Sequence, residues 1–229
     1  MRLYHFTNTQ YGLQNIEKKR LKIARILDLN DPFEFIAMKL ETRVQRQHLR
    51  RRRDEIHARV GIICFSDRWN DPLMWSHYAD RHRGICLGFD VSDAANPRRI
   101  RYRTDLPDPT TLGYASLEEM TEQQWSEMGF VKSRDWAYER EHRLVIDLKK
   151  ADQDGTLHFQ PFTADLQLAE VIVGARCQLH DDQLIGSLGE NWQDVRRIKA
   201  RLAFKSFTVV EQRDPSMWEA TDQSQGDAA

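Results

Sequence analysis

The chain has 229 residues, of which 30% are charged, and its formal net charge is -1 because 34 lysines and arginines nearly balance 35 aspartates and glutamates. This balance gives the whole chain no preference for a polyanionic partner, so any such preference depends on local clusters of charge. The first ten residues lack the apolar core of a signal peptide, and no window approaches the roughly 18 apolar residues of a membrane span. We therefore expect a cytoplasmic protein with no membrane partner.

An apolar run at residues 2–6 (RLYHF) predicts a short strand that carries His5. Asn8 follows this run and belongs to the residue types that cap helices, so a helix is expected over the segment that contains Ile16. The chain is therefore expected to begin with a strand followed by a helix.

A second helix is predicted over residues 31–59. Asp31 suits its N-cap, Pro32 its first position and Glu34 its third, which is the pattern of a capping box. The distal half of this helix carries four consecutive arginines: Arg50, Arg51, Arg52 and Arg53. Such a run is typical of a solvated, protruding helix end, and it is also a candidate contact with the phosphates of RNA or DNA.

The segment WNDPLMWSHYADRHRGICLGFD, residues 69–90, predicts a short helix between two strands. Asp71 suits the N-cap and Pro72 the first helical position, so the helix is expected to start at residue 72. Trp75 and Tyr78 are three positions apart and share one face of this helix. These two aromatic side chains are candidates either for core packing or for one wall of a ligand pocket.

The run EHRLVIDL, residues 141–148, predicts a strand. Alternation places Glu139, Glu141 and Arg143 on one face and apolar side chains on the other face, which is expected to point into the protein. Paired carboxylates are suited to proton transfer or to stabilising a cation. The alternative is an exposed face of ion pairs between these carboxylates and neighbouring arginines.

Strands and irregularly spaced helices without a regular alternation predict an α+β fold and argue against a doubly wound parallel sheet. We expect one α+β domain over residues 1–213, from which part of the helix at 31–59 protrudes. Residues 214–229 are acidic and rich in small side chains, so they are expected to form a disordered tail.

The three cysteines, Cys64, Cys86 and Cys177, are an odd number and lie in or beside apolar runs, which favours buried thiols. A zinc site would combine two of them, Cys64 and Cys86, with His77 and His82. This spacing matches no paired zinc knuckle, so no metal site is predicted.

Three blocks of the sequence stand out: LNDPFEF, ICFSDRWNDPLMWSHYADRHRGICLGFD and WAYEREHRLV. Together they resemble the bacterial family known as domain of unknown function 2971 (DUF2971). A more distant resemblance lies in LYHFTNTQYGLQNI, which is similar to the opening of the ADP-ribosyltransferase fold, particularly that of DarT-like modifiers of nucleic acid.

The second resemblance implies a split sheet, mixed or antiparallel, with flanking helices, and a site that binds NAD as a co-substrate. In that superfamily the site combines a histidine on the first strand, an aromatic residue near the second and a glutamate that opens a later strand. The positions that match this order are His5, then Trp75 or Tyr78, then Glu141. Glu139 would orient or deprotonate the acceptor, and Arg143 would balance the carboxylates or contact a phosphate.

Cleavage of NAD between ribose and nicotinamide builds positive charge on the ribose, so a fixed carboxylate such as Glu141 would stabilise the transition state. The resemblance therefore predicts transfer of ADP-ribose to a macromolecule, with DNA or RNA as a candidate acceptor. It also suggests a toxin or anti-phage role, in which an antitoxin would be a partner. Two alternatives stay open: a non-catalytic module that binds nucleic acid or a nucleotide, and a nuclease or other hydrolase that uses Glu139 and Glu141 with a divalent metal.

Overall fold

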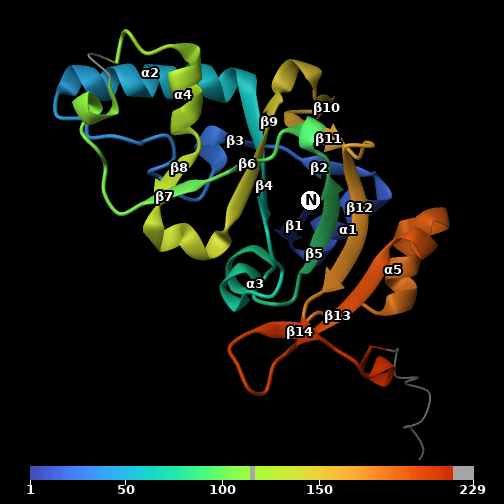
Figure 1. Cartoon of the computed structure of the whole chain (residues 1–229). Coiled ribbons are helices and arrows are strands. Elements are labelled where there is room, and N and C mark those ends of the chain that lie inside the picture. The colour runs from blue at the N-terminus through green and yellow to red at the C-terminus, as the bar shows by residue number, and fades with distance from the viewer. Residues whose placement is uncertain (114–116, 219–229) are drawn as a thin grey trace, which may run out of the picture. The chain divides into compact units, whose positions relative to one another are not determined.

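The computed structural model describes residues 1–113 and 117–218 (Figure 1). Within the expected single domain, the chain divides into two compact units. Both units combine helices with strands, so the predicted α+β class is confirmed. Unit 1 comprises Met1–Leu3, Arg20–Arg68 and Asp90–Gln167, and unit 2 comprises Tyr4–Lys19, Trp69–Phe89 and Leu168–Ala229.

The α-helices of unit 1 are α2 (Arg43–Arg59) and α4 (Glu122–Met128). Its strands are β2 (Arg20–Lys22), β3 (Ala24–Arg25), β4 (Val60–Ser66), β6 (Arg98–Arg99), β7 (Arg101–Arg103), β8 (Val131–Ser133), β9 (Glu141–Asp147), β10 (Asp152–Asp154) and β11 (Leu157–Pro161). Its 3₁₀ turns are η1 (Ile26–Asp28), η2 (Asp93–Ala95), η3 (Pro109–Leu112), η4 (Arg134–Glu139) and η5 (Leu148–Lys150).

The strands of unit 1 are mostly antiparallel. β4 and β9 form the central pair, β3 pairs with β4, and β6 pairs with β9. The register of the central pair sets Cys64 opposite Arg143 and Ser66 opposite Glu141. Two smaller sheets have the strand orders β10-β11-β2 and β7-β8, the latter parallel. The mixed and antiparallel pairing that was predicted is therefore confirmed.

Unit 2 holds most residues of β1, β5 and β12, in the strand order β14-β13-β12-β5-β1. β12 and β13 are parallel, whereas β13 and β14 form an antiparallel hairpin. The elements are β1 (Arg2–Thr7), α1 (Thr9–Glu17), α3 (Pro72–Tyr78), β5 (Ile85–Val91), β12 (Leu166–Val173), α5 (Asp181–Leu188), η6 (Gly189–Asp194), β13 (Arg196–Leu202), β14 (Val209–Glu211) and η7 (Pro215–Met217).

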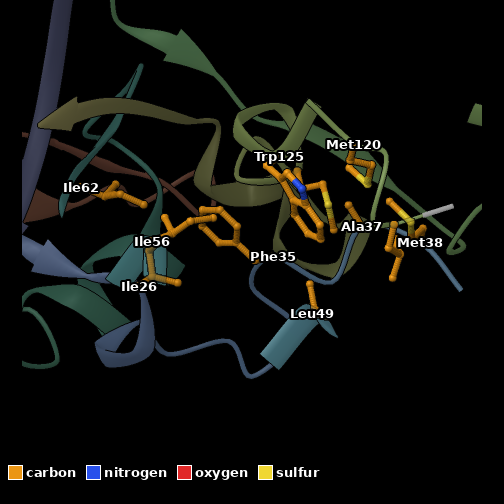
Figure 2. Close-up of a cluster of buried hydrophobic side chains, with 11 residues drawn as sticks. Ile26, Phe35, Ala37, Met38, Leu49, Ile56, Ile62, Met120 and Trp125 are labelled. Carbon is orange, nitrogen blue, oxygen red and sulfur yellow. The ribbon is translucent and has the colours of Figure 1, made fainter. Parts of the chain in front are cut away.

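The core of unit 1 is a cluster of buried apolar side chains contributed by α2, α4 and the loop that follows η1 (Figure 2). Trp125 of α4 and Phe35 of the loop are its large aromatic members, and Ile56 of α2 is buried with them. Burial of such side chains is the main source of folding free energy. This core therefore fixes the loop at residues 31–38 in place.

The helix predicted from residue 31 begins only at Arg43, so the prediction was wrong for residues 31–42. Asp31 does accept a hydrogen bond from the Phe33 N–H at 2.9 Å, as a cap would. Phe35, however, has a φ of 63°, which a right-handed helix does not contain. Its burial, together with that of Glu34, overrides the local capping pattern. The helix starts instead at the Thr42 capping box.

Two other helix starts agree with the local sequence. Asn8 caps α1 by accepting a hydrogen bond from the Tyr11 N–H at 2.8 Å. Asp71 caps α3 in the same way, with Pro72 at the first helical position. These predictions succeeded because a cap is satisfied by its own neighbours and needs no distant partner.

The predicted disordered tail was wrong at its start. Residues 215–217 form η7 between its caps Asp214 and Trp218, and Trp218 Nε1 donates a hydrogen bond to the Leu179 carbonyl at 3.0 Å. The indole has a partner in unit 2, which accounts for the order of this segment. Residues 219–229 of the predicted tail lie outside the described residues. Among the residues that are described, no helix is long and apolar enough to cross a membrane.

Candidate functional site

Charged side chains gather in the interior of unit 1 around the start of β9. Each is at most 8% exposed. Because burial of an unpaired charge is strongly unfavourable, such groups must neutralise one another. Three carboxylates against two cations leave one net negative charge. We name this set the charge cluster: Glu34, Lys132, Glu139, Glu141 and Arg143.

Arg143 is the centre of the charge cluster. Its Nη1 and Nη2 donate to the two carboxylate oxygens of Glu34 at 2.9 and 2.6 Å. Its Nε and Nη2 donate to the two oxygens of Glu141 at 2.6 and 3.0 Å, and Nη1 also donates to the Gly129 carbonyl at 2.8 Å. A guanidinium carries five N–H donors, so these contacts use every one of them.

Lys132 is the second cation and lies among three carboxylates. Its Nζ donates to Glu139 at 2.6 Å and to Glu141 at 3.2 Å, and it lies 3.6 Å from a Glu34 oxygen. The same ammonium lies 4.9 Å from the centroid of the Trp136 ring. Although burial alone would lower the pKa of Lys132, the neighbouring carboxylates of Glu141 and Glu139 raise it well above its usual range. Lys132 is therefore a fixed positive charge.

A turn in the backbone brings the two carboxylates together. Glu139 closes η4 and Glu141 opens β9, and Arg140 between them has a φ of 48°. This left-handed residue reverses the chain so that both carboxylates reach Lys132. Glu139 was expected on the strand, and that placement is wrong. The face that carries Glu141 and Arg143 is also buried, which rules out the alternative of an exposed ion-pair surface.

Glu141 stays ionised inside the protein. Burial acts to raise its pKa, but the Arg143 guanidinium and the Lys132 ammonium outweigh burial and lower the pKa to about 2. The Cys64 thiol also hydrogen-bonds to this carboxylate. Burial and the Glu141 charge in turn raise the pKa of the Cys64 thiol well above its usual range. Cys64 is thus a neutral donor to the cluster.

Tyr102 fixes the first residue of β9. Its Oη accepts a hydrogen bond from the Glu141 N–H at 2.8 Å. Burial raises the pKa of this half-buried phenol well above its usual range, so the side chain is neutral at physiological pH. Tyr102 and the Trp136 ring next to Lys132 are therefore aromatic neighbours of the cluster within unit 1.

Three of the residues predicted for an NAD site belong to unit 2. Trp75 is fully buried there, where its ring packs at 87° against Phe6 with centroids 5.3 Å apart and its Nε1 donates to the Trp69 carbonyl at 2.6 Å. The face of Trp75 is therefore used in core packing and is not available to stack on a ligand. His5 in β1 and Tyr78 in α3 are half-buried. Glu139, Glu141 and Arg143 belong to unit 1, where Arg143 contacts Glu141 directly and Lys132 links Glu141 to Glu139.

The four consecutive arginines of α2 differ in their surroundings. Arg50 and Arg51 are exposed. Arg52 donates to Glu55 at 2.8 Å, pairs with Glu122, and lies 5.7 Å from the Trp125 ring centroid. Arg53 is half-buried, like Arg52. The prediction of a solvated basic helix end thus fits Arg50 and Arg51, whereas Arg52 is engaged by unit 1 itself.

Sequence reasoning missed two members of the charge cluster, Glu34 and Lys132, and two of its neighbours, Tyr102 and Cys64. Glu34 was interpreted as a helix cap, and nothing in the local pattern around Lys132 or Tyr102 indicated a role. The register of β4 against β9 sets Cys64 opposite Arg143, so a correct prediction of that register would have placed Cys64 beside the cluster. In residues 1–113 and 117–218, no group of three or more histidines, cysteines, aspartates and glutamates is arranged to hold a metal ion. The position between the carboxylates is occupied by the Lys132 ammonium.

The model of the family described as Protein of unknown function (DUF2971) matches residues 74–144. This segment begins within α3, ends within β9 and includes Tyr102, Lys132, Glu139, Glu141 and Arg143. Neither a curated protein nor a solved structure matches the chain. The match confirms the resemblance to this family over residues 74–144, which are less than half of the chain.

Proposed function

We propose that the chain transfers ADP-ribose from NAD to a macromolecule and that the charge cluster supplies the anion for this reaction. The observation that carries the proposal is Glu141, a carboxylate with a pKa of about 2 that opens β9 beside a second carboxylate, Glu139. A negative charge that is fixed in a low-dielectric interior stabilises a developing cation more strongly than one in water.

The proposed reaction assigns a separate task to each carboxylate. The bond between ribose C1′ and the nicotinamide nitrogen breaks, and nicotinamide leaves as a neutral molecule with the bonding electron pair. An oxygen or nitrogen of the acceptor forms the new bond to C1′. Glu141 stabilises the positive charge that builds on the ribose, and Glu139 takes the proton of the acceptor.

The hydrogen bonds of Glu141 indicate where a substrate would bind. Oε1 accepts from Arg143 Nε, and Oε2 accepts from Arg143 Nη2 and from Lys132 Nζ. If Lys132 moves away from Glu141, it still has Glu139 and Glu34 as partners. If Arg143 moves away, the buried Glu34 carboxylate loses the guanidinium that pairs with it. A ribose hydroxyl is therefore proposed to replace Lys132 at Oε2. Because Glu141 is only 4% exposed, this exchange also requires the cluster to open.

Incubation of the full chain with NAD labelled in its adenylate part, together with total cellular RNA, DNA and protein, tests the proposal. The expected result is label on one class of macromolecule, release of nicotinamide, and loss of both with Glu141→Gln. His5→Ala and Tyr78→Ala test the roles that the resemblance assigns to those residues. Absence of label and of nicotinamide, with Glu141→Gln indistinguishable from the parent, would overturn the proposal.

A second candidate is a non-catalytic module that binds nucleic acid through α2, and it is favoured by the exposure of Arg50 and Arg51. Removing two phosphate contacts from a duplex complex should reduce the slope of log affinity against log salt by about 2. The double variant Arg50→Gln/Arg51→Gln is expected to show this reduction, whereas Glu141→Gln should leave binding unchanged. An unchanged slope in the double variant excludes α2 as the binding surface.

A further inference from the structure

A loop joins β13 to β14 (Figure 1), and it carries two phenylalanines, Phe204 and Phe207. Phe204 is 91% exposed and Phe207 is 99% exposed. Single exposed apolar side chains are common on protein surfaces, but two rings of this exposure in one short loop indicate an interaction site. We name residues 202–208 the hairpin tip.

The backbone of the hairpin tip is held by hydrogen bonds. The Ala203 N–H donates to the Thr208 carbonyl at 3.0 Å, and the hydroxyls of Ser206 and Thr208 lie 2.8 Å apart. At the start of β14, the fully buried Val209 donates its N–H to the Asn70 carbonyl at 3.0 Å. The two rings are therefore presented by an anchored loop.

Positive charge surrounds the hairpin tip. The sequence from Val195 to Val210 contains no carboxylate but contains five cations: Arg196, Arg197, Lys199, Arg201 and Lys205. The first two form ion pairs with carboxylates elsewhere in unit 2, and the third donates to backbone carbonyls.

Within the described part of the chain, neither Arg201 nor Lys205 forms an ion pair, although Arg201 Nη1 donates to the Leu202 carbonyl at 3.1 Å. The Arg201 guanidinium lies 5.1 Å from the centroid of the Phe204 ring. Charge and aromatic surface thus occur together at the hairpin tip, which is complementary to a polyanion that also carries flat rings.

Both phenylalanines line a concave site of about 650 Å³, together with Pro72, His82 and Lys205. A bilayer surface is flat and would contact the rings from outside without filling this concavity. A planar base that has left its stack can enter the concavity and lie against a ring. The concave shape therefore favours a nucleic acid over a lipid surface.

We propose that the hairpin tip binds single-stranded nucleic acid. One base stacks on Phe204 and another on Phe207, and Arg201 and Lys205 contact the neighbouring phosphates. Binding of this kind requires no NAD, so the inference stands apart from the transfer reaction. If transfer also occurs, the hairpin tip makes single-stranded nucleic acid the acceptor class.

Fluorescence anisotropy of a labelled oligonucleotide of about 12 thymidines, with the full chain and without NAD, tests the proposal. Phe204→Ala and Phe207→Ala are each expected to weaken binding about tenfold, which is the usual effect of losing one stacked base. Lys205→Gln is expected to weaken binding and to reduce the salt slope by about 0.7, because one phosphate contact is lost from a single strand.

Phe33→Ala is the matched control, because Phe33 is also an exposed phenylalanine, at 59%, and belongs to unit 1. It should bind the oligonucleotide like the parent. All four substitutions are at exposed positions, so the far-ultraviolet circular dichroism and the melting temperature should not change. A duplex of the same length should bind at least about tenfold more weakly than the single strand.

Several results would overturn the proposal. Equal affinity for duplex and single strand, or no effect of Phe204→Ala and Phe207→Ala, would show that no base stacks at the tip. Phenylalanine-dependent binding to phosphatidylserine vesicles without oligonucleotide binding would assign the tip to a lipid surface. Phenylalanine-dependent dimers in light scattering, again without oligonucleotide binding, would assign it to a second copy of the chain. If the parent chain binds the oligonucleotide but transfers no label from NAD, this result contradicts only the proposed transferase.

Discussion

Arg143 and Glu34 are 109 positions apart in the sequence, yet two guanidinium nitrogens of Arg143 donate to the two carboxylate oxygens of Glu34 at 2.9 and 2.6 Å. Both side chains are buried, and the same guanidinium also holds Glu141. The contact therefore joins the loop before α2 to the start of β9. The Arg143 guanidinium thus links this loop to the carboxylate on which the proposed chemistry depends.

Arg143→Lys is expected to lower the free energy of unfolding by about 3 kcal/mol, because an ammonium has three donors and cannot bind two carboxylates in bidentate geometry. Urea denaturation at neutral pH measures the change. Arg140→Lys is the matched control, since the Arg140 side chain is 43% exposed and pairs with Asp67 at the surface. That variant should lose less than about 1 kcal/mol. Equal losses in the two variants would contradict the central role of Arg143.

The stability of the protein should depend on the ionisation of Glu141. Its pKa is about 2 in the folded chain against an ordinary value of 4.5. A lowered carboxyl pKa stabilises the folded state above the ordinary value, and this contribution disappears as the pH falls from about 4.5 towards 2. The stability difference between the parent and Glu141→Gln should therefore be clearly smaller near pH ~3 than near pH ~6. A difference that does not change with pH in urea titrations would contradict the assignment.

Gly129→Ala is expected to destabilise unit 1 by about 1 to 3 kcal/mol through overpacking. A β-carbon at this position would lie 2.6 Å from Phe35 Cζ, and the Gly129 carbonyl must stay in place to accept from Arg143. Gly186→Ala in α5 is the opposite case, because its β-carbon would meet nothing within 4 Å. Helix propensity predicts that it stabilises the chain by up to about 1 kcal/mol. Melting temperatures that move in the same direction would refute this packing argument.

Substitutions at Trp75 and Tyr78 should differ in their effect on the free energy of unfolding, because Trp75 is a core residue and Tyr78 is only half-buried. Trp75→Phe removes a buried indole and its hydrogen bond to the Trp69 carbonyl, so it should cost about 1 to 3 kcal/mol of unfolding free energy. The half-buried Tyr78 should tolerate phenylalanine with a change below about 1 kcal/mol. Chemical denaturation of both variants distinguishes the two roles. A larger loss of unfolding free energy for Tyr78→Phe than for Trp75→Phe would contradict the assignment of Trp75 to the core of unit 2.

Local sequence patterns predicted those elements whose stabilising partners are close in the chain. The caps at Asn8 and Asp71 are of this kind. The start of the second helix was predicted wrongly because Glu34 and Phe35 have their partners elsewhere in unit 1. A capping pattern cannot outweigh the burial of those two side chains.

The candidate site was predictable only in part for a similar reason. Alternation correctly placed Glu141 and Arg143 on one strand face, but it does not reveal what that face contacts. Cys64 comes from β4, which only the pairing of distant strands brings to Glu141, whereas Lys132 lies nine positions before Glu141 and reaches it across η4. The left-handed turn at Arg140, which moves Glu139 off the strand, has no signal in the sequence.

The release of nicotinamide from NAD by Glu141→Gln and Glu34→Gln, compared at a temperature where both are folded, tests the proposed function most directly. Both substitutions remove a carboxylate that binds Arg143, so they should cost similar stability. Only Glu141 is proposed to face the reacting ribose. We predict that Glu141→Gln lowers the rate of release at least about a hundredfold, whereas Glu34→Gln stays within about fivefold of the parent. Equal rates in the two variants would contradict a chemical role for Glu141, whether both rates stay near that of the parent or both fall.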